Sequence, residues 1–205
     1  MKYKVVNEGL RDLTPMEDRS NGVHISGVLY ALCVARGIYK AGEPLGEDEK
    51  TRMNLGNALE DAIIARYQAA DKRRYIKIGE QECDGMFGTP DMLDSQEWAI
   101  HEMKLTWMSS KHHIESVKLW KYLVQLMAYC YMVKTLVGYL HVCYVNGDYS
   151  YQSPGGDPTY RVHRFEFTKQ ELEDNWAMLK NHAYMAKAED HVALAPAQKK
   201  GKARK

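Results

Sequence analysis

Residues 98–107 alternate with a period of two that predicts a β-strand, and this segment contains Glu102 and Lys104. Alternate side chains share one face of a strand, so these two would project together about 6.6 Å apart. His101, Met103 and Leu105 would project from the other face. A carboxylate suits Mg²⁺ or Mn²⁺, and a lysine beside such a metal can orient water or stabilise charge on a phosphate. The pair therefore has the chemistry of a metal-assisted phosphate site.

A second carboxylate, Asp91, comes just before a turn predicted at 94–96. In an antiparallel pair of strands joined by such a short turn, Asp91 can lie opposite or diagonal to the Glu102 region. Carboxylates crowded in this way repel one another unless they share a proton or a cation. Two carboxylates and a lysine are therefore expected to converge on one face of the sheet.

Two helices are expected to add further polar groups. Glu60 lies at the edge of an apolar stripe on a helix expected at 47–70, where a buried acid needs a partner. Gln125 and Tyr129 are four residues apart in an almost wholly apolar segment, so they share one face of a buried helix. A buried amide also needs a hydrogen-bond partner, and a metal-bound carboxylate or a phosphate would serve.

The elements that must position these residues follow from periodicity and turn signals. Helices are expected at 23–39, with Ser26 as an N-cap, and at 47–70, where the stripe is Met53, Leu59, Ile63 and Tyr67. Strands follow from 74 to the Asp84-Gly85 turn, at 86–93 and at 98–107. The rest is a helix at 116–134, strands at 137–145 and 160–167, and a helix from a Thr168–Glu171 capping box to about 188. The order α-α-β-β-β-α-β-β-α predicts an α/β protein in which helices enclose one central mixed sheet.

Composition limits the function classes. The chain has 205 residues, 45% hydrophobic, with 28 Lys+Arg against 27 Asp+Glu. A net charge of +1 excludes a strongly basic, histone-like binder. Four cysteines lie far apart without a CxxC pair, and no signal peptide is evident at the start, which favours reduced thiols in a cytoplasm. The apolar stretch 119–145 is interrupted by charged and polar residues, so no membrane partner is expected.

In this order, four motifs resemble those of the PD-(D/E)XK nuclease superfamily, in its RecB-type and lambda-exonuclease-like branch. They are Gly56-x-x-x-Glu60, Gly88-Thr89-Pro90-Asp91, Glu102-Met103-Lys104 and Gln125-x-x-x-Tyr129. Each is weak singly, but their order on helix, hairpin strand, strand and following helix is specific. The resemblance covers about residues 25–167 and implies a restriction-endonuclease-like core. Residues 1–194 are expected to form a single nuclease domain. The composition of 195–205 predicts a basic, disordered tail.

The resemblance also implies residue roles. Asp91, Glu102 and the Met103 carbonyl would hold Mg²⁺, for which Mn²⁺ could substitute, and Lys104 would act on the attacking water. Glu60 would ligate or orient the metal site. Gln125 and Tyr129 would support the site and touch DNA. Glutamate at 60 and 102, where RecB-type domains often have histidine and aspartate, favours the lambda-exonuclease side, and the cysteine spacing predicts no iron–sulfur cluster.

The expected activity is that of a Mg²⁺-dependent DNA exonuclease in recombination, repair or phage DNA metabolism, located in the cytoplasm of a bacterium or of a phage-infected host. A structure-specific or single-strand endonuclease with the same site is one alternative. An inactive nucleic-acid-binding module is another. DNA ends are the expected partner, and a homo-oligomer is possible.

Basic residues outside the motifs have two interpretations. Lys111 and His112, which follow the strand at 98–107, could contact DNA phosphates, and an exposed loop explains them equally well. The tail, which ends Lys199-Lys200-Gly201-Lys202-Ala203-Arg204-Lys205, would add non-specific attraction to nucleic acid or only aid solubility.

Overall fold

The computed structural model describes residues 22–40, 47–108, 110, 116, 119–145 and 159–193. Its helices are α1 (Ile25–Ala35), α2 (Glu47–Ala70), α3 (Trp120–Val133) and α4 (Lys169–Ala193). Its strands are β1 (Val23–His24), β2 (Tyr75–Ile76), β3 (Gln81–Cys83), β4 (Met86–Gly88), β5 (Met92–Asp94), β6 (Ala99–Thr106), β7 (Val137–Tyr144) and β8 (Thr159–Glu166). The expected α/β class is confirmed.

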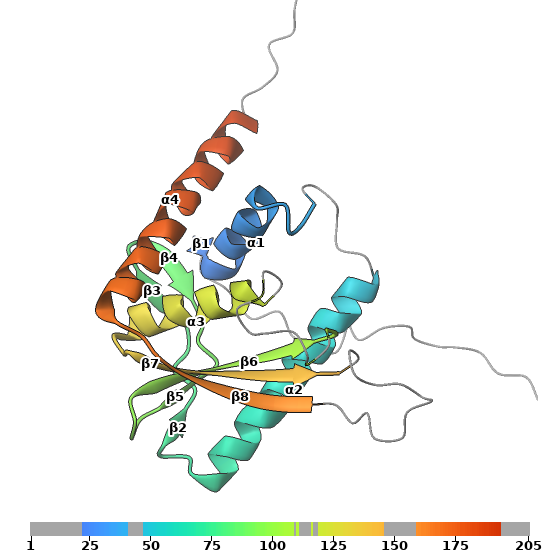
Figure 1. Ribbon diagram of the computed structural model, residues 1–205, viewed down its shortest axis with the longest axis vertical. Coiled ribbons are helices and arrows are strands. Elements are labelled where there is room, and N and C mark those ends of the chain that lie inside the picture. The colour runs from blue at the N-terminus through green and yellow to red at the C-terminus, as the bar shows by residue number, and fades with distance from the viewer. Residues whose placement is uncertain are drawn as a thin grey trace, which may run out of the picture.

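The main sheet has five strands in the order β2-β5-β6-β7-β8. Strands β6 and β7 are parallel, and the other neighbours are antiparallel, so the sheet is mixed as expected. Helices α1, α3 and α4 lie on one side of this sheet, and α2 crosses the other side (Figure 1). This arrangement agrees with the restriction-endonuclease-like core that the motif resemblance implies.

The expected central mixed sheet is present, but the structure also has a second sheet of three strands, β1-β4-β3, that the sequence did not predict. The segments expected as two continuous strands at 74–83 and 86–93 each divide into two short strands. The break before β5 falls at Pro90, which has no N–H to donate to a ladder. The break between β2 and β3 includes Gly79, whose φ is +73°. The Asp84-Gly85 hairpin turn is confirmed, with φ values of 52° and 72°.

The start of the first helix also differs from the prediction. Residues 23–24 form β1, which pairs in parallel with β4, and α1 begins only at Ile25. Ser26 is therefore inside the helix and is not its N-cap, a position that His24 takes without a side-chain hydrogen bond. By contrast, the capping box of α4 is confirmed, because the Glu171 carboxylate accepts a hydrogen bond of 2.7 Å from the Thr168 N–H.

The core occupies both sides of the main sheet. On the α3 side, side chains from α1, α3 and α4 pack on Ile100, Leu140 and Val142. On the α2 side, a smaller cluster forms around Ile64, Met92 and Met103. Met53, expected in the apolar stripe of α2, is 55% exposed, because this end of the helix extends away from that cluster. In the part of the chain that the structure describes, no helix is long and apolar enough to cross a membrane.

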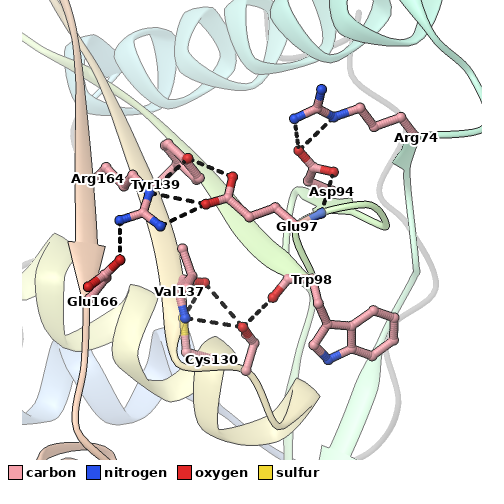
Figure 2. Close-up of polar contacts among 10 residues, drawn as sticks. Arg74, Asp94, Glu97, Trp98, Cys130, Val137, Tyr139, Arg164 and Glu166 are labelled. Atoms are coloured by element: carbon pink, nitrogen blue, oxygen red, sulfur yellow. Dashed lines mark hydrogen bonds and ion pairs between the residues drawn. The ribbon is translucent and has the colours of Figure 1, made fainter.

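The turn between β5 and β6 is tied together by Asp94, as Figure 2 shows. The Arg74 guanidinium donates hydrogen bonds of 2.8 and 2.6 Å to Asp94 Oδ2, and the N–H groups of Gln96 and Glu97 donate to Oδ1. Burial would raise the pKa of Asp94, but these hydrogen bonds hold it below its usual range. The turn fixes the register of β5 on β6, and Asp91 precedes β5 by one residue.

The same end of the sheet is linked across three strands. The Tyr139 hydroxyl on β7 donates to Glu97 Oε2 at 2.7 Å, and the Arg164 guanidinium on β8 donates to Glu97 Oε1 at 2.8 Å (Figure 2). The Thr135 hydroxyl donates to the carbonyl of Trp98, which has a φ of 55° that bulky residues rarely adopt. These contacts hold the turn end of the sheet together.

A buried histidine pair lies on the α2 side of the sheet. His101 Nδ1 and His141 Nε2 are 2.9 Å apart, and His141 Nδ1 is 2.5 Å from the Tyr160 hydroxyl. Tyr67 of α2 meets both imidazoles edge-on. Only one proton can lie between the two facing ring nitrogens, which requires at least one of the rings to be neutral.

We expect His141 to make the stability of the fold depend on pH. Burial and the neighbouring His101 lower the pKa of His141 to about 3. Between pH 6.5 and pH 3, His141 binds a proton in the unfolded chain but stays neutral in the folded chain. The contribution of neutral His141 to the free energy of unfolding is therefore complete above pH 6.5 and falls as the pH drops toward 3. Urea unfolding at pH 7, 6, 5 and 4 measures the loss, expected to be on the order of a few kcal/mol.

The control is His141→Gln, whose amide can keep hydrogen bonds to both neighbours and does not titrate. Its unfolding free energy should fall less steeply with acid than that of the wild type. Identical slopes for the two proteins would contradict the role of His141.

Candidate active site

Strand β6 presents Glu102 and Lys104 on one face, as the alternation predicted. Lys104 Nζ lies 2.6 Å from Glu102 Oε1, and the two side chains are 16% and 1% exposed. Met103 points to the opposite face, where it packs with Met92 and Ile64. The site is therefore built on a regular strand, whose neighbours restrict the rotamers of both charged side chains.

Asp91 lies beside this pair, at the point where the β5–β6 ladder ends. The last paired residues are Met92 and His101. Beyond them, Asp91 Oδ2 accepts a hydrogen bond of 2.7 Å from the Met103 N–H. The predicted approach of Asp91 to the Glu102 region is confirmed. Met103 itself contacts Asp91 through its N–H, and a role for its carbonyl as a metal ligand stays a prediction.

Glu60 reaches the same cluster from α2, with its Oε1 3.8 Å from Lys104 Nζ. Helix α2 lies on the far side of the sheet, but β5 pairs with β6 only as far as His101, so Glu60 can approach Lys104 past the end of β5. Its side chain is 22% exposed. The expectation that Glu60 lies at the edge of the buried face of its helix, near the site, is confirmed in position.

The charges of the cluster are unbalanced, since three carboxylates surround one ammonium group. Burial opposes the charge on Lys104, but the carboxylates of Glu102, Glu60 and Asp91 hold the pKa of Lys104 well above its usual value. Burial raises the pKa of Glu60 to about 7, an effect that Lys104 opposes and Asp91 reinforces. Burial and the charge of Asp91 also raise the pKa of Glu102 well above its usual value. Further positive charge would therefore stabilise the ionised carboxylates.

The residues present fit a divalent cation bound by hard oxygen ligands. Glu102 Oε2 is buried and has no hydrogen-bond partner, a costly arrangement that a metal ion would relieve. Among the described residues, no three Asp, Glu, His or Cys side chains form a ready-made metal site. Glu102 Oε1 is paired with the Lys104 ammonium group, and Asp91 Oδ2 accepts a hydrogen bond from the Met103 N–H. Binding a metal therefore requires these carboxylates to rotate or exchange partners.

Gln125 and Tyr129 of α3 lie at the same site and contact each other. Gln125 Nε2 donates a hydrogen bond of 2.8 Å to the Tyr129 hydroxyl. Burial, reinforced by the charge of Glu102, raises the pKa of Tyr129, so the phenol stays protonated and can donate its own hydrogen bond. The predicted shared face is confirmed, while the roles of both residues in catalysis and DNA contact stay predictions.

A cavity of about 750 Å³ opens over the cluster. Six of the predicted site residues line it: Glu60, Asp91, Glu102, Lys104, Gln125 and Tyr129. Lys111 and His112, the two predicted DNA contacts on the segment after β6, lie outside the described residues, as does the basic tail. The volume is large enough for a nucleotide, and the carboxylate and ammonium groups lie in the wall of this cavity.

The cavity has further lining residues that sequence reasoning missed. Asn57 precedes Glu60 by three residues on α2, and Lys121 precedes Gln125 by four on α3, so helical spacing from the motif residues could have identified both. Tyr30 and Tyr39 also line the cavity. No local signal marked these two tyrosines, because they reach the site only through the packing of α1 against α3.

Comparison with solved structures supports the fold. The crystal structure of SSO0001 matches 86% of this chain and 81% of its own, with a TM-score of 0.52 and 14% identity, which shows a shared fold. A phage-related exonuclease from Haemophilus somnus matches 78% of each chain at a TM-score of 0.46 and 16% identity. The alkaline exonuclease LHK-Exo from Laribacter hongkongensis matches 84% of this chain and 94% of its own, at a TM-score of 0.43 and 17% identity.

No protein-family model matches the chain, and no curated protein sequence matches it.

Proposed function

We propose that this protein is a metal-dependent deoxyribonuclease that hydrolyses phosphodiester bonds, acting as an exonuclease on DNA ends. The observation that carries the proposal is the buried contact between Lys104 and Glu102, with Asp91 and Glu60 beside it in the wall of a nucleotide-sized cavity. The exonuclease mode, and a role in recombination, repair or phage DNA metabolism, rest on the motif resemblance.

Asp91 and Glu102 would hold Mg²⁺ or Mn²⁺, with Glu60 as a further ligand or an orienting group. When bound, such a cation lowers the pKa of a coordinated water and offsets charge on the scissile phosphate. Lys104 stays protonated among the carboxylates, so its ammonium group orients the attacking water and stabilises the negative charge that develops on the phosphate.

Gln125 and Tyr129 would hold the cluster from the side of α3. Because the Gln125 amide is committed to the Tyr129 hydroxyl, the two side chains restrict one another and present a pre-formed polar wall. The protonated phenol can donate to a carboxylate or to a phosphate oxygen. Preorganised donors of this kind favour the transition state because they need not reorient during the reaction.

The test is digestion of end-labelled linear duplex and single-stranded DNA beside a covalently closed circle, with Mg²⁺, with Mn²⁺ and with EDTA. Metal-dependent loss of the linear substrates, with the circle intact, is the expected result. Cutting of the circle would show that the protein is an endonuclease with the same site, and not an exonuclease. Absence of cutting with every metal would overturn the proposed hydrolysis.

A further inference from the structure

A group of three tyrosines and a lysine forms part of the cavity wall, and the proposed hydrolysis leaves it without a role. We call this group the aromatic shelf, and it consists of Tyr30, Tyr39, Lys121 and Tyr122. It comes from the middle of α1, the residues that follow this helix and the start of α3. Lys121 is four residues before Gln125, so the shelf lies one helical turn, about 6 Å, from the polar wall of the site.

The rings of the shelf are arranged for stacking. Tyr30 and Tyr39 are stacked on each other, with ring centroids 5.7 Å apart and an interplanar angle of 26°. Tyr30 is 44% exposed, whereas the core of α1 is formed by Ile25, Val28 and Leu32. The fold therefore does not need the Tyr30 ring for its core, and this ring remains accessible from the cavity.

A cation accompanies these rings. Lys121 Nζ lies 4.9 Å from the ring centres of both Tyr39 and Tyr122, and it donates a hydrogen bond to the Tyr39 hydroxyl. These contacts hold the ammonium group at the hydroxyl end of Tyr39 and near the Tyr122 ring, at the cavity wall. Aromatic faces that bind bases, next to a cation that attracts the backbone, are the combination that recognises single-stranded nucleic acid.

We propose that the aromatic shelf binds an unpaired nucleobase, which stacks on the Tyr30–Tyr39 pair while Lys121 attracts the adjoining phosphate. This inference rests on the proposed nuclease function, because it supplies the substrate class for the same cavity. A base inside a duplex is covered on both faces by its neighbours and cannot stack on a tyrosine. The shelf therefore selects single strands and frayed ends over an intact duplex.

Binding without cleavage tests this inference directly. The probe is a short single-stranded DNA with a terminal 2-aminopurine. It is titrated in EDTA with the wild-type protein and with the Tyr30→Leu, Tyr30→Phe and Val162→Ala variants. Stacking should quench the probe fluorescence. Tyr30→Leu should lose the quenching and weaken binding roughly tenfold, the size expected for one stacked base. Tyr30→Phe keeps the ring and should bind like the wild type.

Val162→Ala serves as the control, because Val162 is 45% exposed on β8 and does not line the cavity. It should leave binding unchanged. A blunt duplex of the same sequence should bind more weakly than the single strand. No quenching with wild-type protein, equal binding of Tyr30→Leu and wild type, or equal binding of duplex and single strand would each overturn the inference.

The inference and the proposed function can fail separately. If the protein cuts no DNA with any metal but Tyr30→Leu loses binding and quenching, base binding by the aromatic shelf is supported and the proposed hydrolysis is refuted. If metal-dependent cutting occurs and Tyr30→Leu binds and cuts like the wild type, the proposed hydrolysis is supported and base binding by the aromatic shelf is refuted.

Discussion

Lys104→Ala is expected to lower the rate of DNA cleavage at least about 100-fold, the size of effect seen when a positioned proton-transfer or charge-stabilising group is removed. The ammonium group is the only cation that the structure describes within 4 Å of Glu102 and Glu60. Without it, the water loses an orienting donor and the phosphate loses a stabilising charge. Initial rates on end-labelled DNA at saturating Mg²⁺ measure the loss.

The matched control is Lys77→Ala. Lys77 also forms an ion pair with an acidic residue of α2, at 3.6 Å from Asp61, but its side chain is 47% exposed and does not line the cavity. This variant should cleave at the wild-type rate. Thermal unfolding of both variants shows whether they are folded. A folded Lys104→Ala protein that cleaves as fast as the wild type would refute the assigned role.

Gly88→Ala is expected to damage the site without touching a charged group. A Cβ added at Gly88 would lie 2.6 Å from Tyr129 Cε1 and 3.3 Å from Ile25 Cγ1. Because the Tyr129 ring is buried, it can give way only by moving α3 or losing its contact with Gln125. Overpacking of this kind typically costs about 1–3 kcal/mol. Urea unfolding should show this loss, and cleavage should fall with it.

Gly27→Ala is the control, because nothing lies within 4 Å of its added Cβ and the residue lies inside α1. Alanine there should raise the unfolding free energy by about 0.5–1 kcal/mol. The double variant Gly88→Ala/Tyr129→Leu should be less destabilised than the sum of its single variants, because the ring that collides is gone. Additive losses would show that the collision is not with Tyr129.

The role of Gly88 shows where sequence reasoning stopped short. The motif marks Gly88 without giving a reason for a glycine there, and Gly88 does not have the left-handed φ found at Gly37, Gly79 and Gly85. Gly88 instead leaves space for the ring of Tyr129, which is 41 positions later in the chain. A collision between residues so far apart leaves no mark on either local segment.

Features that depend on local periodicity were predictable. A period of two places Glu102 and Lys104 on one face of any β-strand, whatever the strand pairs with. The bounds of α2, the capping box at Thr168 and the parallel pairing of β6 with β7 follow from similarly local signals, since a helix between two strands allows them to be parallel.

Features that depend on which distant segments meet were decided by tertiary packing. Pro90 signals a break in a strand, but the division into two sheets depends on β1, which pairs with β4 across more than sixty residues. Glu60 reaches Lys104 only because β5 ends early and leaves that edge of β6 open to α2. Tyr39 meets Lys121 only where the segment that follows α1 lies beside the start of α3. Backbone periodicity is set by neighbours in the chain, whereas the approach of these side chains is set by how whole elements bury their apolar faces.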